Sequence, residues 1–209
     1  MKLVLYFSSF LATLIIIFCS SFTNSIGIEK EIKNFSLKGV TNKTVSLHDY
    51  KDAKGFVIVF TCNKCPMAKM YTERLNYIQD KFKKQQVYVL AINSMDTLVY
   101  AEESFEMMQK KAKNDKLNVP YLQDKKQKVA KQFNATHTPQ AFIIWKNKEN
   151  KFIVKYQGAI DDNAGEPHKA NPYLIHSLYE LLSGKSVSNP KTNSFGCKIF
   201  YRGKKNKMN

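Results

Sequence analysis

The residues best suited to chemistry are two cysteines, Cys62 and Cys65, separated by two residues and followed by a proline. They come after the apolar run 56–60 and before a segment with helical spacing, so they stand where a strand passes into a helix. The free N–H groups and positive dipole end of a helix N-terminus stabilise a thiolate over a thiol. The spacing lets the sulfurs join, so the pattern indicates a dithiol that can hold or release two electrons.

Within this pair, Cys62 is predicted to be the nucleophile because it falls at the helix start, whereas Cys65 would lie a turn inside. Lys64 adds a nearby cation that favours the thiolate. Cys65 would then resolve the mixed disulfide formed on Cys62. An inert disulfide and half of a zinc site stay open as alternatives. The only further ligands for zinc would be Cys197 and one of His48, His137, His168 and His176.

The composition describes one ordinary domain rather than a nucleic-acid binder. A chain of 209 residues with 44% hydrophobic side chains can fill one core. Its formal charge is +16, but Arg74 and Arg202 are the only arginines, and the lysines fall on the polar faces of helical segments. Bidentate recognition of phosphates and bases favours arginine, so nucleic acid is not expected as a partner. A loose attraction to anionic membrane surfaces stays open.

The first 25 residues have the layout of a secretory signal peptide. A basic start is followed by the apolar stretch 3–19 and a polar exit. Thr23 and Ser25 fit a small-x-small cleavage site, which puts the mature start near Ile26. An uncleaved membrane anchor is the alternative, because the apolar stretch approaches the roughly 20 residues that span a bilayer. We therefore expect an exported protein, periplasmic or otherwise extracytoplasmic, in a compartment where a dithiol can persist oxidised.

The order of the remaining elements predicts an α/β domain with a mixed sheet over 26–186, followed by a tail over 187–209 that carries Cys197. An N-terminal hairpin is expected from the segments 35–37 and 45–47. Further strands are expected at 56–60, 87–92, 119–122, 140–145 and 152–156. Helices are expected over 67–84, 99–114, 125–133 and 172–183.

Five motifs make the chain resemble the thioredoxin superfamily, and within it the exported redoxins related to the alkyl-hydroperoxide-reductase and thiol-specific-antioxidant type. They are Phe60-Thr61-Cys62-Asn63-Lys64-Cys65-Pro66, Ala91-Ile92-Asn93-Ser94, Thr136-His137-Thr138-Pro139, Gly158-Ala159-Ile160-Asp161-Asp162-Asn163 and Phe195-Gly196-Cys197. The resemblance covers roughly residues 30–200. It implies a thioredoxin-like fold and a thiol–disulfide oxidoreductase that exchanges disulfides with protein substrates, without a cofactor or a resident metal.

The resemblance also suggests roles for residues outside the pair. Thr138 and Pro139 would form a cis-proline loop that faces the cysteines and pairs with an incoming polypeptide. His137 could tune the thiolate or mark a metal-binding variant, although a plain loop histidine is favoured. Cys197 either packs as a small hydrophobe or approaches the pair as a third thiol. Asp161 and Asp162 could accept protons beside the site, although a solvated turn is favoured for them.

Three positions depart from the patterns of related proteins. Phe56 and Ala68 stand where thioredoxins and cytochrome-maturation redoxins carry an acid, so the usual proton carrier for the resolving thiol is missing. Val59 stands where peroxiredoxins carry a threonine, which disfavours a peroxidase. Copper-delivery relatives have a spacer one residue longer between their cysteines. A thiol-dependent peroxidase and a redoxin-fold binding module for a metal or a partner are kept as alternatives to the oxidoreductase.

Overall fold

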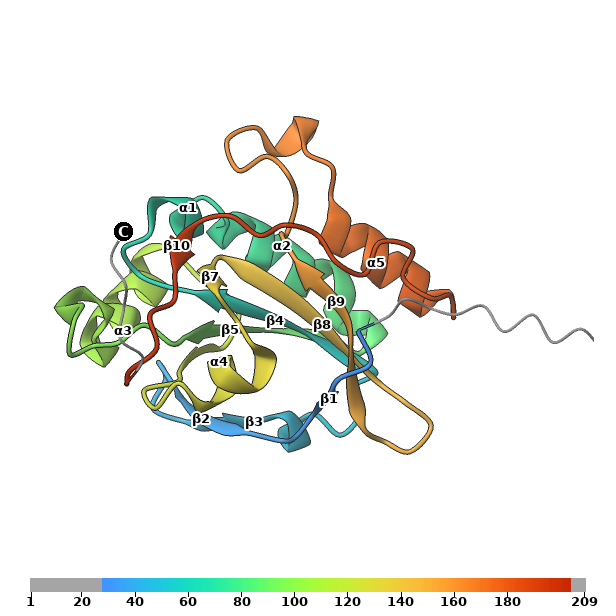
Figure 1. Cartoon of the computed structure of the whole chain (residues 1–209), viewed down its shortest axis with the longest axis horizontal. Coiled ribbons are helices and arrows are strands. Elements are labelled where there is room, and N and C mark those ends of the chain that lie inside the picture. The colour runs from blue at the N-terminus through green and yellow to red at the C-terminus, as the bar shows by residue number, and fades with distance from the viewer. Residues whose placement is uncertain (1–27, 204–209) are drawn as a thin grey trace, which may run out of the picture.

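The computed structural model describes residues 28–203, so the predictions for residues 1–25 lie outside the described part of the chain. Its centre is an eight-stranded sheet in the order β1-β9-β8-β4-β5-β6-β2-β3 (Figure 1). The strands are β1 (Glu31–Ile32), β2 (Ser36–Gly39), β3 (Thr44–Ser46), β4 (Gly55–Thr61), β5 (Val87–Asn93), β6 (Tyr121–Gln123), β8 (Gln140–Lys146) and β9 (Phe152–Gly158). A separate two-stranded sheet joins β7 (His137–Thr138) to β10 (Cys197–Lys198).

The helices lie between these strands and after them. They are α1 (Pro66–Lys69), α2 (Thr72–Phe82), α3 (Phe105–Asn114), α4 (Lys128–Phe133) and α5 (Tyr173–Leu182). Short 3-10 turns cover Leu47–Asp49, Lys83–Gln85, Ala101–Glu103 and Pro167–Lys169. β4 and β5 are parallel because helical segments carry the chain back between them, whereas β8 pairs antiparallel with both β4 and β9.

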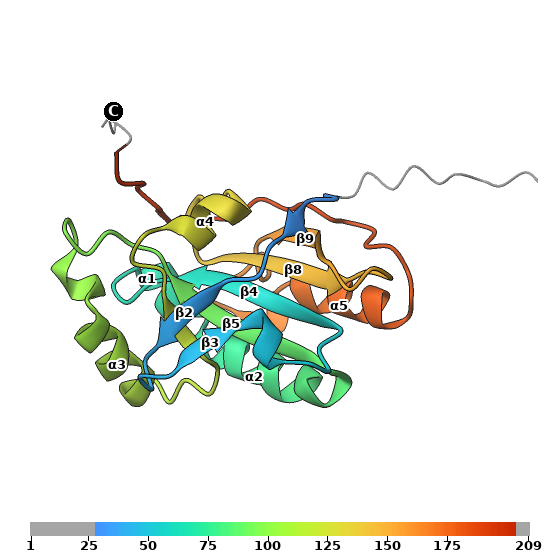
Figure 2. The ribbon, with the colours of Figure 1, turned by 90° about the horizontal axis from the view of Figure 1, so that it is seen from below.

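The sheet has a core on each face, and β4 contributes to both. Its seven residues are all buried, as expected for a central strand covered on two sides. Phe56, Ile58 and Phe60 enter one core, and Val57 and Val59 enter the other. Figure 2 shows the layers: α4 lies on one side of the sheet, and α2, α3 and α5 lie on the other. β4 therefore ends, at Thr61, between two packed layers that fix the start of the cysteine loop.

Two predicted helices are shorter or divided in the structure. The segment 67–84 forms α1 and α2 rather than one helix, with Met70 and Tyr71 between them. The segment 99–114 forms a 3-10 turn and then α3, which begins at Phe105 after the N-cap Ser104. The Ser104 hydroxyl accepts a hydrogen bond from the Met107 N–H, so a local cap fixes that start. The interruption puts Glu103 before α3, where it turns inward and is buried.

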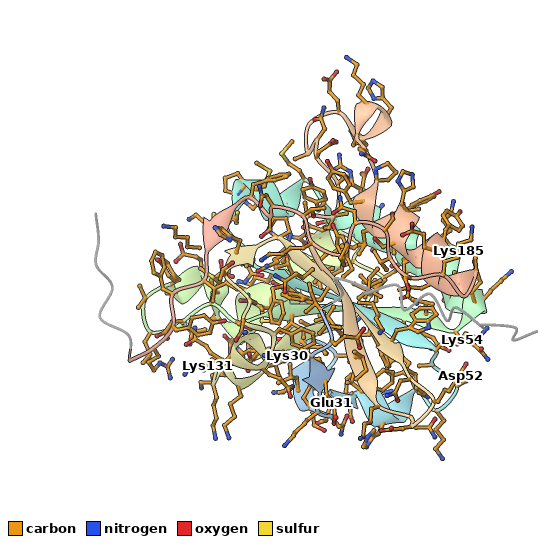
Figure 3. All side chains as sticks on the ribbon, turned by 45° about the vertical axis from the view of Figure 1, so that its right-hand side comes forward. Lys30, Glu31, Asp52, Lys54, Lys131 and Lys185 are labelled. Carbon is orange, nitrogen blue, oxygen red and sulfur yellow. The ribbon has the colours of Figure 1, made fainter. Side chains whose placement is uncertain are left out.

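The lysines surround the molecule. In Figure 3, Lys54 and Lys185 are labelled at the right-hand side of the molecule, and Lys30 and Lys131 are labelled farther to the left. They come from the approaches to β1 and β4, from α4 and from the segment after α5, and all four are exposed. This spread places positive charge on several separate elements. Across residues 28–203, no helix combines the length and apolar character needed to span a membrane.

Candidate functional site

Cys62 and Cys65 lie in the loop between the end of β4 and the start of α1. Pro66 is the first residue of α1, where a missing N–H costs little, and Cys65 is the N-cap. The sequence-based prediction put Cys62 at the helix start and Cys65 a turn inside. The helix begins later than predicted, so Cys62 precedes it and Cys65 stands at its terminus. The N–H groups of Met67 and Ala68 therefore act on Cys65 rather than on Cys62, and they lower the pKa of Cys65.

Both sulfurs contact the loop that carries Thr138 and Pro139. Cys62 Sγ lies 3.2 Å from Thr138 Oγ1, and the neutral Cys65 thiol donates to the Thr138 carbonyl at 3.3 Å. The Thr138–Pro139 peptide bond is cis, as the resemblance implied. Cys62 and Cys65 are 1% and 3% exposed, so this loop and its neighbours shield both thiols from solvent.

The environment separates the acidities of the two thiols. Burial and the nearby Glu103 carboxylate raise the pKa of Cys62 to about 12. Burial also acts to raise the pKa of Cys65, but hydrogen bonds from the Cys197 side chain and from the N–H groups of Ala68, Cys197 and Met67 outweigh it. The pKa of Cys65 is therefore lower than that of an ordinary thiol. Cys65 is therefore the more acidic thiol of the pair.

Glu103 is the acid that sequence reasoning missed. Its side chain is 2% exposed and accepts hydrogen bonds from the backbone N–H groups of Asn63 at 2.7 Å and Lys64 at 3.0 Å. Asn93 donates to the same carboxylate at 2.8 Å. Tyr121 donates its hydroxyl to the Asn63 side chain at 2.9 Å and so joins β6 to the cysteine loop. The carboxylate thus holds the two residues between the cysteines in place.

No local signal marked Glu103, because it stands in a charged stretch that resembled the solvated face of a helix. Its role depends on contacts with residues distant in sequence, which only the folded chain brings together. The chain therefore has a buried acid beside the pair, although Phe56 and Ala68 occupy the two positions where the resemblance expected one.

The C-terminal tail returns to the site. β10 pairs antiparallel with β7, and Cys197 lies opposite Thr138 in that register. The Cys197 side chain and N–H act on the Cys65 sulfur and lower the pKa of Cys65. Of the two alternatives that the sequence left open for Cys197, the structure has the third thiol beside the pair. Figure 1 shows β10 next to β7 and close to α1.

The remaining predicted residues contribute less directly. The Lys64 side chain is 72% exposed and pairs with Glu102 at 3.6 Å, so the part of Lys64 that serves the site is its backbone N–H. His137 is partly buried, and its Nδ1 lies 2.9 Å from Thr136 Oγ1. Within residues 28–203, no three His, Cys, Asp or Glu side chains are grouped to hold a metal ion.

Asp161 is not the solvated turn residue that the sequence favoured. Its side chain is buried, accepts a hydrogen bond from the Tyr71 hydroxyl at 2.8 Å and pairs with Arg74 at 3.2 Å. It therefore ties the loop after β9 to α2. Asp162 is exposed and accepts from the Asn171 N–H at 2.7 Å, as a turn residue does.

A cleft of about 850 Å³ begins beside the cysteine loop. Asn63 and Lys64 form one wall, and its other lining residues include Met70, Met107 and Lys110. Met70 is 48% exposed and Met107 is 39% exposed. Flexible methionine side chains adapt to irregular apolar surfaces, and the lysine stems add apolar area beneath a charged head.

The comparisons with known proteins agree with this architecture. The sequence profile of the AhpC/TSA family matches residues 28–161. A comparison with curated proteins gives no match. An uncharacterized conserved protein from Geobacillus kaustophilus is 31% identical, with 87% of this chain and 95% of that chain covered and a TM-score of 0.74. A hypothetical protein from Sinorhizobium meliloti 1021 is 28% identical, with 87% and 98% covered and a TM-score of 0.75.

A third solved structure shows the fold alone. The thioredoxin domain of a thiol-disulfide oxidoreductase from Bacteroides vulgatus is 17% identical, with 64% of this chain and 91% of that chain covered and a TM-score of 0.50. The mixed sheet, the helices on both of its faces and the cysteine loop at the end of β4 are the features expected of a thioredoxin-like protein. With the family profile matching more than half of its length, the chain belongs to the AhpC/TSA family and has a thioredoxin-like redoxin fold.

Proposed function

We propose that this protein is a thiol–disulfide oxidoreductase whose redox couple is Cys62 and Cys65, and whose substrates are protein thiols and disulfides. One observation carries the proposal: the two buried thiols are free and share a partner, because both contact Thr138. The Cys65 N–H also donates to Cys62 Sγ, which holds the sulfurs in one small loop. A redox couple whose disulfide forms and breaks at each turnover needs two thiols that lie close together and are not permanently bonded.

The acidities of the two thiols support an order of attack. In the oxidised couple, a substrate thiolate attacks Cys62 and expels Cys65, because the thiol of lower pKa leaves faster. The product is a mixed disulfide on Cys62. A second substrate thiolate then attacks the substrate sulfur and expels Cys62, which takes up a proton. The substrate gains one disulfide and the protein becomes a dithiol, so two electrons pass to the protein.

The reverse sequence reduces a substrate disulfide. Cys62 then forms the mixed disulfide, and the Cys65 thiolate attacks Cys62 to release the substrate thiol. This assigns Cys62 to the mixed disulfide and Cys65 to its resolution, as the sequence predicted. The physical ground differs, since it is the leaving-group quality of Cys65 rather than a helix terminus at Cys62.

We propose that Thr138 and Pro139 bind the substrate polypeptide. The short strand β7 presents a backbone edge directly beside both sulfurs, and in the structure β10 is paired with that edge. An extended segment that adds to such an edge gains main-chain hydrogen bonds whatever its side chains are. β10 must leave this edge before a substrate segment can pair with it.

A trapping experiment tests the couple and the order of attack. Cys65→Ser and Cys62→Ser are each combined with Cys197→Ser, so that the third thiol cannot interfere, and both are incubated with a disulfide-containing protein. We expect the chain with Cys65→Ser to accumulate mixed disulfides on non-reducing gels, because nothing resolves the bond on Cys62. We expect the chain with Cys62→Ser to accumulate far less. If neither variant traps a partner and the wild type reduces no disulfide substrate, the proposal fails.

We further propose that the protein works outside the cytosol, in the periplasm or a comparable compartment. The support is the sequence of residues 1–25, with its basic start, apolar stretch and small-x-small exit. Fractionation of cells that express the full chain, with N-terminal sequencing, tests the proposal. A mature start near Ile26 in an extracytoplasmic fraction is the expected result, and an intact N-terminus in the cytosol contradicts it.

A further inference from the structure

We propose that Cys197 is a third redox cysteine, which exchanges with the Cys62–Cys65 disulfide at the Cys65 sulfur and forms a Cys65–Cys197 disulfide. The inference goes beyond the couple proposed above. It rests on that couple only for the source of the disulfide that Cys197 takes over. Its physical basis is the docked tail, which can be tested without Cys62.

Cys197 lies beside Cys65 in the docked tail. The Cys65 thiol donates to the Thr138 carbonyl at 3.3 Å, and Cys197 stands opposite Thr138 where β10 pairs with β7. The Cys197 side chain and N–H also act on the Cys65 sulfur and lower its pKa. Cys65 therefore lies between two other thiols, with Cys62 before it in the loop and Cys197 across from it on the tail. Two thiols held beside the same residue need only a small movement to reach the S–S bond length of about 2.05 Å.

The backbone of the tail approaches β7 closely just before Cys197. Gly196 has φ +133°, and a Cβ atom on it would lie 2.2 Å from the Thr138 carbonyl oxygen. Only glycine lets the chain approach β7 this closely, and the approach delivers the next residue, Cys197, to Cys65. On the far side of Cys197, the Ile199 N–H donates to the Thr136 carbonyl at 2.8 Å.

Several contacts anchor the tail beyond Cys197. The Ile199 side chain is 6% exposed and enters the core on the α4 side of the sheet. Gln127 donates to the Phe200 carbonyl at 2.8 Å and accepts from the Arg202 N–H at 2.8 Å. The Arg202 guanidinium also donates to Asp96, with Nε 3.1 Å from Oδ2. A segment that merely lay on the surface would not need this series of buried and charged contacts.

The exchange balances without an outside oxidant. The Cys197 thiolate attacks Cys65 Sγ in the Cys62–Cys65 disulfide, and the new S–S bond forms as the old one breaks. Cys62 leaves as a thiolate and takes up a proton equivalent to the one that Cys197 lost. One disulfide is consumed and one is made. The attacking and leaving groups are both cysteine thiolates of the same chain, so the exchange can run in either direction.

The consequence is a route between the buried couple and the outside. Cys62 and Cys65 are almost fully covered, whereas Cys197 is partly exposed. A thiol or disulfide in solution can therefore reach Cys197 while the tail is docked. Electrons would enter or leave the couple through Cys197, and the substrate would meet Cys62 when the tail is released.

Disulfide mapping tests this inference. Reduced Cys62→Ser and Cys65→Ser proteins are treated with oxidised glutathione, which supplies the two oxidising equivalents, and are quenched by alkylation at timed intervals. Mass spectrometry of the peptides then identifies each bond. We expect Cys62→Ser to form the intramolecular Cys65–Cys197 disulfide at least tenfold faster than Cys65→Ser forms one between Cys62 and Cys197. Equal rates, or a Cys62→Ser protein that carries only glutathione adducts, would overturn the inference.

Gly196→Ala provides the matched control, because it keeps every cysteine and disturbs only the approach of the tail. Combined with Cys62→Ser, it should slow the Cys65–Cys197 bond at least tenfold, and an unchanged rate would contradict the role given to the docked tail. Cys197→Ser tests the proposed couple by itself. If this variant forms no Cys62–Cys65 disulfide, the proposed function fails, whereas the result for Cys62→Ser still decides whether Cys65 and Cys197 react.

Discussion

At the scale of single residues, Glu103 sets the electrostatic contrast between the two cysteines. Its carboxylate accepts hydrogen bonds from the backbone between them and, after burial, is the main influence that raises the pKa of Cys62. The pKa of Cys65 is lowered instead, because neighbouring N–H groups and the Cys197 side chain act on its sulfur. Burial and this acid thus hold the pKa of Cys62 high in the tail-docked form, while the pKa of the adjacent Cys65 thiol is lowered.

Replacing this acid should change the titration of Cys62. Glu103→Gln removes the negative charge, so we expect the pKa of Cys62 to fall by about 1 from its value near 12. The pH dependence of Cys62 alkylation by iodoacetamide, followed by peptide mass spectrometry, measures the effect. Because a thiolate reacts and a thiol does not, alkylation between pH 8 and 10 should be faster in the variant.

Glu102→Gln is the control for that measurement. The Glu102 side chain is 37% exposed and pairs with the surface Lys64 rather than with the loop backbone, so its loss should leave the titration of Cys62 unchanged. Equal effects of the two substitutions would show that general surface charge, rather than the buried carboxylate, determines the acidity of Cys62.

At the scale of elements, the thiols are surrounded by β4, α1, β7 and β10. Some of these elements could be predicted from the sequence and others could not. The strand at 56–60 and the Thr138–Pro139 loop could be predicted, since one is a continuous apolar run and the other follows a motif. The pairing of β10 with β7 could not, because a two-residue strand has no periodicity and its partner is distant in sequence.

The anchoring of the tail makes a prediction at this scale. Arg202→Ala removes the charged contact with Asp96, so β10 should leave β7 more often and expose Cys197. We expect alkylation of Cys197 in the reduced protein to become severalfold faster. Lys198→Ala, on the exposed side of the same strand, is the control and should change the rate little. If both variants behave like the wild type, the Arg202 contact does not hold the tail.

At the scale of the whole molecule, the two cores hold the sheet that positions the loop. Phe142 on β8 packs edge-on against Phe60 of β4 and Phe133 of α4, with ring centroids 5.7 Å and 5.1 Å apart. These rings join the strand that leads into the cysteines to the helix that covers it. The general α/β architecture followed from composition and periodicity, whereas the division into α1 and α2 and the inward turn of Glu103 depend on tertiary contacts.

This core makes a stability prediction. Phe142 is 1% exposed, so Phe142→Ala should leave a cavity and lower the free energy of unfolding by about 3–5 kcal/mol. Leu98→Ala, at a side chain 79% exposed, should change it by no more than about 0.5 kcal/mol. Urea denaturation followed by circular dichroism measures both. Similar losses of unfolding free energy for the two variants would contradict the burial of Phe142 in the core.

The central claim is that Cys62 and Cys65 form a working redox couple, and the reduction potential of that couple tests it most directly. The protein with Cys197→Ser is equilibrated in glutathione or dithiothreitol buffers of known potential, and the Cys62–Cys65 bond is quantified by alkylation and mass spectrometry. We predict one two-electron transition between about −270 and −120 mV, the range of thioredoxin-fold oxidoreductases. A pair that stays reduced throughout, or that titrates below about −300 mV as structural disulfides do, would contradict the account.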